Sequence, residues 1–196
     1  FAGAEANYRR AAQLSPRHPE PLVGRARAIL LSLGVPFDLS AALGNAARER
    51  KVGEARTLLA AAQRLDPAYA PAFIESGRAA LLVGDSNAAL GALEQAVKLA
   101  PRDAEAWSTR GIARLATGRS ADALTDLQQA VALDPTSAPR RRNLATVLLL
   151  QGRAAEAVRS YEDAVRLDPT SAGAHNDLGA ALLQTGEVPR AISVLE

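Results

Sequence analysis

The sequence contains no cysteine and no methionine, and only one tryptophan, three tyrosines and three phenylalanines occur among its 196 residues. The lack of cysteine excludes disulfides, thiolate nucleophiles and cysteine ligands for a metal. Alanine is abundant instead, and small side chains suit close contact between helices better than a bulky central core. The composition therefore favours helices packed closely against one another.

Long apolar runs and an excess of one charge are also missing. No apolar run approaches the roughly 18 residues that a helix needs to cross a bilayer, so we expect no membrane span. Nearly all basic residues are arginine, but acidic residues almost balance them and leave a net charge of +2. Nucleic acid is therefore not favoured as a partner. The excess of arginine and alanine over lysine is typical of a GC-rich bacterial genome, and we expect a soluble protein of the bacterial cytoplasm or periplasm.

No motif in the chain predicts catalysis. A Gly-rich phosphate loop, a nucleophile elbow and a cluster of metal ligands are all absent. The histidines His18 and His175 have no second ligand at a usable spacing, so we interpret both as structural. The Asp-Pro pairs that begin at Asp66, Asp134 and Asp168 are typical of turns at helix ends. We expect no enzymatic activity, no cofactor and no metal site.

What the chain does contain is a unit that returns every 34 residues, starting at Ala70, Ala104, Ala138 and Ala172. In each unit two apolar runs with helical spacing flank a glycine, and a proline follows the second run in the first three units. This pattern predicts a helix, a tight turn and a second helix. A hairpin this short cannot bury both of its faces, so the units must stack against one another. The glycines and prolines are Gly84, Gly118, Gly152, Gly186, Pro101, Pro135 and Pro169.

The pattern resembles the tetratricopeptide repeat, whose signature has Trp, Leu, Gly and Tyr in the first helix, Ala, Phe and Ala in the second helix, and then Pro. Two kinds of departure occur: Arg141 and His175 replace the first bulky residue, and Ser76 and Arg110 stand where the family usually has Leu. The matching positions are Phe73 and Trp107; Gly77, Gly111, Ala145 and Gly179; Ala89, Ala123, Ala157 and Ala191; Leu93, Leu127, Tyr161 and Leu195; and Ala96, Ala130 and Ala164. Because Trp107 lies in the central unit, where neighbours stack on both sides, we expect its side chain to be buried.

The resemblance implies an all-α, right-handed superhelical solenoid of antiparallel helix hairpins, with about five to six repeats and one irregular insertion. We predict a single solenoid over residues 1–196 that is cut within a repeat at both ends. Residues 1–19 form the second helix of a partial repeat, and residues 20–69 form an irregular repeat. The regular repeats are 70–103, 104–137 and 138–171, and a partial repeat covers 172–196.

The insertion occupies residues 35–52, because Glu20 and Ala70 are separated by one repeat of 34 residues plus 16 more. Its alanine-rich composition favours a helix. We expect this segment to join residues 54–65 in one long, irregular helix, although a flap outside the stack is the alternative. Its apolar residues Phe37, Leu39 and Leu43 would then cover a neighbouring helix or meet a partner.

The resemblance also implies a scaffold without enzymatic activity, which binds a peptide or partner protein along the concave surface of the first helices. The arginine run 140–142 would either pair with acidic residues of neighbouring units or bind a carboxylate or phosphate. The lysine of the family's carboxylate clamp is missing, and only Asn143 occupies the position of its asparagine ladder, with Asp177 as a near substitute. The candidate contact residues are Arg78, Thr109, Arg142, Asn143, Thr146, Asn176 and Asp177.

Two other functions remain open on the sequence alone. The chain is similar to the repeat arrays attached to glycosyltransferases and sulfotransferases, where it would be a substrate-docking or regulatory region of a larger enzyme. It is also similar to the repeat proteins of bacterial envelope assembly, which act in pilus assembly and polysaccharide export. A catalytic domain elsewhere in the full-length gene would favour the first function, and an upstream signal peptide the second.

Overall fold

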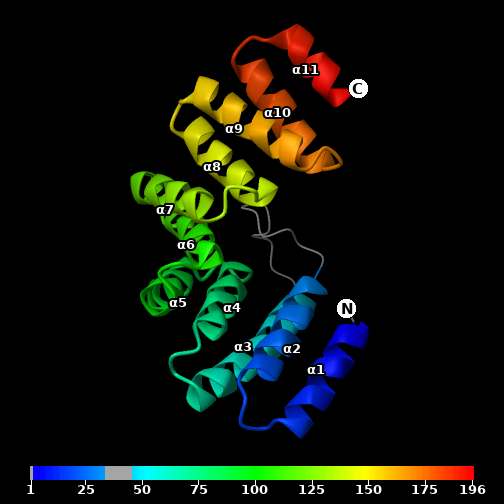
Figure 1. Ribbon diagram of the computed structural model, residues 1–196, viewed down its shortest axis with the longest axis vertical. Coiled ribbons are helices and arrows are strands. Elements are labelled where there is room, and N and C mark those ends of the chain that lie inside the picture. The colour runs from blue at the N-terminus through cyan, green and yellow to red at the C-terminus, as the bar shows by residue number, and fades with distance from the viewer. Residues whose placement is uncertain (1, 34–45) are drawn as a thin grey trace.

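The computed structural model describes residues 2–33 and 46–196, and all regular structure in these ranges is helical (Figure 1). The helices follow one another in a curved stack, with the first helix α1 and the last helix α11 at opposite ends. Their bounds are α1 (Ala2–Leu14), α2 (Glu20–Leu31), α3 (Ala46–Leu65), α4 (Ala70–Leu81), α5 (Ser86–Leu99), α6 (Ala104–Ala116), α7 (Ser120–Leu133), α8 (Ala138–Leu150), α9 (Ala154–Leu167), α10 (Ala172–Gln184) and α11 (Val188–Leu195).

The helices pair as hairpins, and the hairpins stack. Helices α4 and α5, α6 and α7, α8 and α9, and α10 and α11 form successive pairs, and each second helix also contacts the first helix of the next pair. First helices contact one another along the series α2, α4, α6, α8 and α10, whereas second helices do not do so to a similar extent in the described part of the chain. The first helices therefore line the inner, concave side of an all-α solenoid.

The turn inside each hairpin requires glycine. Gly84, Gly118, Gly152 and Gly186 have φ angles of 75°, 78°, 75° and 79°. Side chains with a Cβ rarely adopt this left-handed conformation, which ends the first helix and reverses the chain within a few residues. The repeated glycine in the sequence is therefore explained by backbone geometry.

A second small-residue position brings the two helices of a hairpin together. An ideal Cβ at Gly77 would lie 2.4 Å from Cγ of Leu93, and one at Gly111 would lie 2.8 Å from Cγ of Leu127. Both leucines are completely or almost completely buried. The absence of a side chain at these glycines lets each leucine pack directly on the backbone of the facing helix.

The insertion is only partly within the described residues. Helix α3 begins at Ala46, so residues 46–52 continue without a break into the helix that the repeat pattern places at 54–65. The predicted apolar residues Phe37, Leu39 and Leu43 lie outside the described residues.

Trp107 is buried only in part. Its side chain is half-buried, and it packs at the edge of a small cluster that contains Ile74 and Val97. The indole Nε1 donates a hydrogen bond to the carbonyl oxygen of Pro101 at 2.9 Å, and the guanidinium of Arg110 lies 4.6 Å from the ring centroid. A polar indole nitrogen and a stacked cation both favour a position at the edge of the interface over its centre.

Candidate functional site

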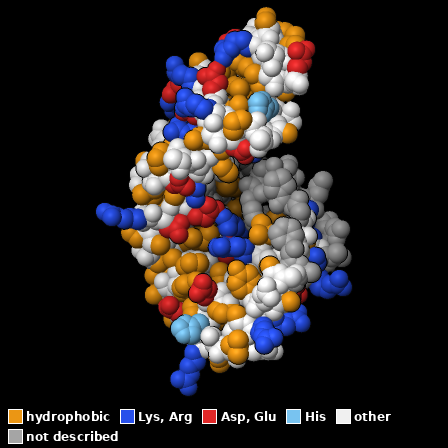
Figure 2. Space-filling model, turned by 45° about the vertical axis from the view of Figure 1, so that its right-hand side comes forward, with side chains coloured by type: hydrophobic (Ala, Val, Ile, Leu, Met, Phe, Trp, Pro, Cys, Tyr) orange, Lys and Arg blue, Asp and Glu red, His pale blue; other side chains and the backbone are white. Residues whose placement is uncertain are grey.

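The concave face contains most of the residues that the sequence suggests as contacts. Asn176 is exposed, whereas Arg142, Asn143, Thr146 and Asp177 are half-buried on α8 and α10. Figure 2 shows side chains of both charges close together in the hollowed middle of the molecule. The structure thus brings five of the seven candidate residues together on two adjacent first helices.

The other two candidates, Arg78 and Thr109, have different surroundings. Thr109 is only 3% exposed, and its hydroxyl donates a hydrogen bond to the carbonyl oxygen of Glu105 at 2.8 Å. Arg78 is 14% exposed and contacts the carboxylates of Glu75 and Glu105. Thr109 therefore faces the packed interior, and Arg78 joins neighbouring helices.

A chain of ion pairs connects the first helices along the inner face. The completely buried carboxylate of Glu75 on α4 accepts from Arg27 of α2 and from Arg78, both at 2.7 Å. Glu105 on α6 contacts Arg78 and also accepts from Arg140 of α8 at 2.8 Å. Each acidic residue is thus shared by arginines of different helices. The sequence shows that Glu75 is negatively charged, but the repeat pattern does not show which charged residues of neighbouring repeats lie next to each other.

The three arginines of the run 140–142 all have acidic partners, in neighbouring units for Arg140 and Arg142 and in the same unit for Arg141. Arg140 contacts Asp134 at 2.7 Å in addition to Glu105, and Arg141 contacts Asp163 at 2.7 Å. Arg142 of α8 donates to Oδ2 of Asp177 on α10 from Nε at 2.9 Å and from Nη2 at 2.6 Å. The side chains of this last pair remain 34% and 35% exposed, so it is the pair most open to solvent among the inner-face contacts from α4 to α10.

A second charged cluster lies between α6 and α7, where the repeat pattern predicts apolar packing. Asp126 is completely buried, and its carboxylate accepts from Arg110 Nε and Nη2 and from Arg114 Nη1, each at 2.8 Å. The departure from Leu at Arg110 was the signal in the sequence that could have revealed this cluster. The carboxylate pairs with both arginines inside the repeat, and only Nε of Arg114 is buried without a hydrogen-bond partner in this cluster as described. We therefore assign the cluster to stability and not to binding.

Tyr161 and Thr146 connect the inner face to the interior of the same hairpin. The hydroxyl groups of the two residues lie 2.9 Å apart. Burial raises the pKa of the Tyr161 phenol above its ordinary value, and the hydrogen bond with Thr146 opposes this effect only in part. The phenol is therefore held in its neutral form within the fold.

We expect Tyr161 to make the protein less stable at alkaline pH. Because the pKa is raised in the folded state, the contribution of Tyr161 is complete below its unfolded pKa of about 10 and is lost as the pH rises through the folded value. The Tyr161→Phe variant should lose less stability than the wild type between neutral pH and pH values above about 10, as measured by urea denaturation. Tyr8→Phe, at an exposed tyrosine, is the control. An equal alkaline loss in wild type and Tyr161→Phe would contradict the expectation.

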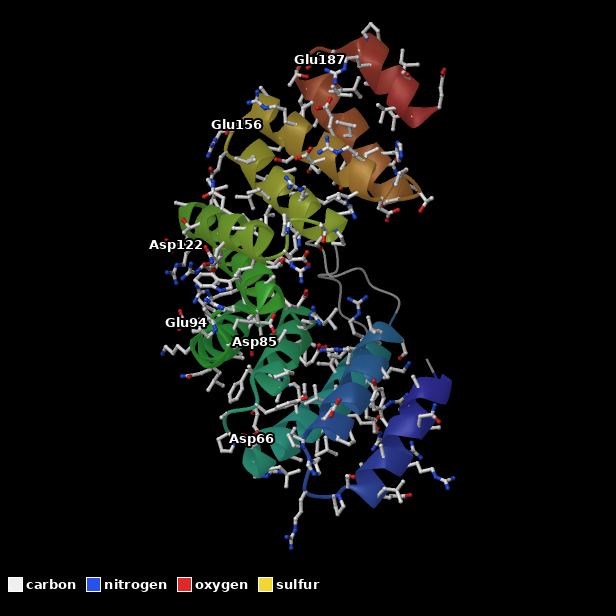
Figure 3. The ribbon with its side chains drawn as sticks, viewed as in Figure 1. Asp66, Asp85, Glu94, Asp122, Glu156 and Glu187 are labelled. Atoms are coloured by element: carbon white, nitrogen blue, oxygen red, sulfur yellow. The ribbon has the colours of Figure 1, made fainter. Side chains whose placement is uncertain are left out.

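Acidic residues also lie at the start of the second helices, where Asp85, Asp122, Glu156 and Glu187 follow one another up the molecule in Figure 3. Negative charge at this end is favourable to the helix dipole. A hydrogen bond from Arg153 lowers the pKa of Glu156, and hydrogen bonds from Thr185 and then Arg190 lower the pKa of Glu187. Asp85 caps α5 by accepting a hydrogen bond from the backbone N–H of Ala88. The other three pair with arginines near the start of their own helices, so we assign all four to the stability of the helix ends.

Neither a metal site nor a membrane span is found among residues 2–33 and 46–196. No group of three or more His, Asp or Glu side chains in these ranges is arranged to hold a metal ion. No helix in them is long and apolar enough to cross a bilayer.

Comparison with known families agrees with the geometry. The family model described as "Tetratricopeptide repeat" matches residues 77–148, and a second model, described as "TPR repeat", matches residues 145–186. The two matches overlap slightly and together follow the hairpins from α4 to α10. The chain belongs to the tetratricopeptide repeat family.

Solved tetratricopeptide repeat structures share this fold. TTC0263, a thermophilic protein of Thermus thermophilus, is 25% identical with a TM-score of 0.74, and the match covers 91% of this chain and 89% of that one. YrrB, described as having an unusual peptide-binding site, is 18% identical with a TM-score of 0.63 and coverages of 95% and 88%. MamA is 23% identical with a TM-score of 0.66 and coverages of 75% and 86%. No curated protein sequence matches the chain.

Proposed function

We propose that this tetratricopeptide repeat protein is a non-enzymatic interaction scaffold that binds a peptide or partner protein on its concave face. The observation that carries the proposal is the cluster of half-buried and exposed polar side chains that α8 and α10 present on that face. Among its members are Arg142, Asn143, Asn176 and Asp177. The peptide-binding site described for the structural neighbour YrrB supports the same general role.

The chemistry of this cluster suits a peptide backbone with an acidic side chain or terminus. Arg142 directs two of its nitrogens to a single oxygen of Asp177, and both side chains remain about one-third exposed. A carboxylate of the partner can therefore reach the guanidinium, which forms strong, directional hydrogen bonds with carboxylates. The amide of exposed Asn176 can both donate to and accept from a peptide group.

The test is capture of a partner by the purified protein, followed by titration of the captured partner against variants. Arg142→Gln and Asn176→Ala are each expected to weaken binding about tenfold, because each removes a polar contact near the centre of the face. Arg166→Gln, at a 75% exposed arginine of second helix α9, is the control and should not affect affinity. The proposal fails if the control weakens binding as much as the two concave-face variants do.

A further inference from the structure

A groove lies on the outer side of the solenoid, between α3 and α5. The repeat pattern does not predict it. The groove has a volume of about 410 Å³, and its floor is the outward face of α4, which Figure 1 shows between the other two helices. The residues along its walls span Arg56 to Gln63 on α3 and Ala88 to Gln95 on α5. At 1.5 Å per residue this is a length of about 10 Å, which is two helical turns.

The groove exists because this repeat has small residues where the following repeats have larger ones. Ser76, Ala80 and Ala92 contribute to its lining. One repeat later the same three positions hold Arg110, Arg114 and Asp126, which fill the space as a buried ion cluster. Further along they hold Leu144, Leu148 and Ser160, and then Leu178, Leu182 and Val194. Of these sets, the earliest has the smallest side chains.

The lining indicates what kind of group fits. The floor is mostly apolar, and its hydroxyl is already satisfied, because Ser76 donates to the carbonyl oxygen of Ala72 at 2.9 Å and accepts from Gln63 at 2.9 Å. Apolar side chains can therefore enter without leaving a buried polar group unpaired. At the rim, Arg56 is exposed and has no acidic partner in the described part of the chain. Among the described residues that line the groove none is acidic, so a negatively charged occupant is favoured over a positive one.

Gly91 is an independent sign that another backbone approaches this wall. It lies in the interior of α5, where glycine destabilises a helix relative to alanine. Nothing in the described part of the chain requires it, because a Cβ at this position would meet no atom there within 4 Å. The matching positions of later repeats carry Thr125, Arg159 and Ser193. A glycine on a groove wall permits close approach of a bound segment.

We propose that this outer groove binds an amphipathic helix of a partner protein. Aliphatic side chains one turn apart on that helix enter the groove over Ser76 and Ala80, and a neighbouring carboxylate pairs with Arg56. The backbone of the helix lies against Gly91. This site faces away from the concave surface, so its occupant does not compete with a ligand there.

The test is selection of a displayed library of random peptides of helix-forming length on the purified protein, with the selected peptides titrated afterwards. We expect peptides that combine aliphatic residues three or four positions apart with an adjacent Asp or Glu. The double variant Ser76→Leu, Ala80→Leu introduces the leucines that the chain itself has at the matching positions 144 and 148. It should reduce the affinity of the selected peptides by at least about tenfold. Arg56→Glu should weaken binding, and Gly91→Ala should do so while raising the melting temperature.

Matched controls distinguish binding in this groove from binding elsewhere on the protein and from effects on stability. Gly53→Ala also replaces an exposed helix glycine with open space around it, and should raise the melting temperature without changing affinity. Arg142→Gln on the concave face should leave affinity unchanged. Because Arg56 and Gly91 are exposed, their variants stay informative if the double variant does not fold. The proposal is overturned by a selection that enriches no peptides, by selected peptides that bind Arg56→Glu and Gly91→Ala as well as the wild type, or by self-association that the double variant abolishes.

Discussion

Replacement of Asp126 by alanine is expected to lower the free energy of unfolding by about 3–5 kcal/mol, because it leaves two inward-facing guanidinium groups without their anion. Asp126 is completely buried, and the side chains of Arg110 and Arg114 are only 11% and 16% exposed. Neither arginine can regain full hydration without opening the contact between α6 and α7. Urea denaturation of the variant measures the loss.

Two comparisons make this prediction specific. Asp122→Ala, on the same helix, removes a carboxylate from a pair that is 45% and 47% exposed, and should cost at most about 1 kcal/mol. The triple variant Arg110→Leu, Arg114→Leu, Asp126→Ser copies the next repeat, and should restore most of the stability because an apolar cluster can replace a buried ion cluster. If Asp126→Ala and Asp122→Ala unfolded at the same urea concentration, Asp126 would not be buried with two cations.

Leu93→Ala is expected to lower the free energy of unfolding by about 2–5 kcal/mol, because it leaves a cavity between α4 and α5. Leu93 is completely buried and packs on the backbone at Gly77. Adding Gly77→Ala to this variant places a methyl group in the cavity, whereas Gly77→Ala alone forces Leu93 to move. The double variant should therefore lose less free energy of unfolding than the sum of the losses of the two single variants. A double-mutant cycle measured by urea denaturation tests this. Additive effects would mean that these two residues do not touch.

The parts of the fold that were predictable from sequence are those with a single local cause. Gly118 recurs because the turn needs a left-handed φ, and Gly111 recurs because Leu127 packs against it. Both requirements return from repeat to repeat, so spacing alone reveals them.

The contacts between repeats were much harder to predict. The partners Glu75 and Arg27 are 48 residues apart in the chain, and their meeting depends on how far one repeat turns relative to the next. The helical pattern predicts Thr109 on the concave stripe, yet its hydroxyl hydrogen-bonds to the backbone of its own helix and its side chain is buried. Helical periodicity predicts the direction of a side chain only to within a fraction of a turn. For a residue at the edge of a helix face, that uncertainty decides whether the side chain meets solvent or the packed interior.

The shared acids of the inner face have a mechanical consequence. From α2 to α8 the ion pairs of Glu75 and Glu105 connect first helix to first helix, while second helices are joined by no such pair in the described part of this stretch. Arg27 and Glu105 are 48% and 39% exposed, so dissolved salt weakens their contacts. Screening should therefore weaken the contacts between first helices more than those between second helices in this stretch. We therefore expect added salt to change the curvature of the solenoid, and with it the width of the concave face.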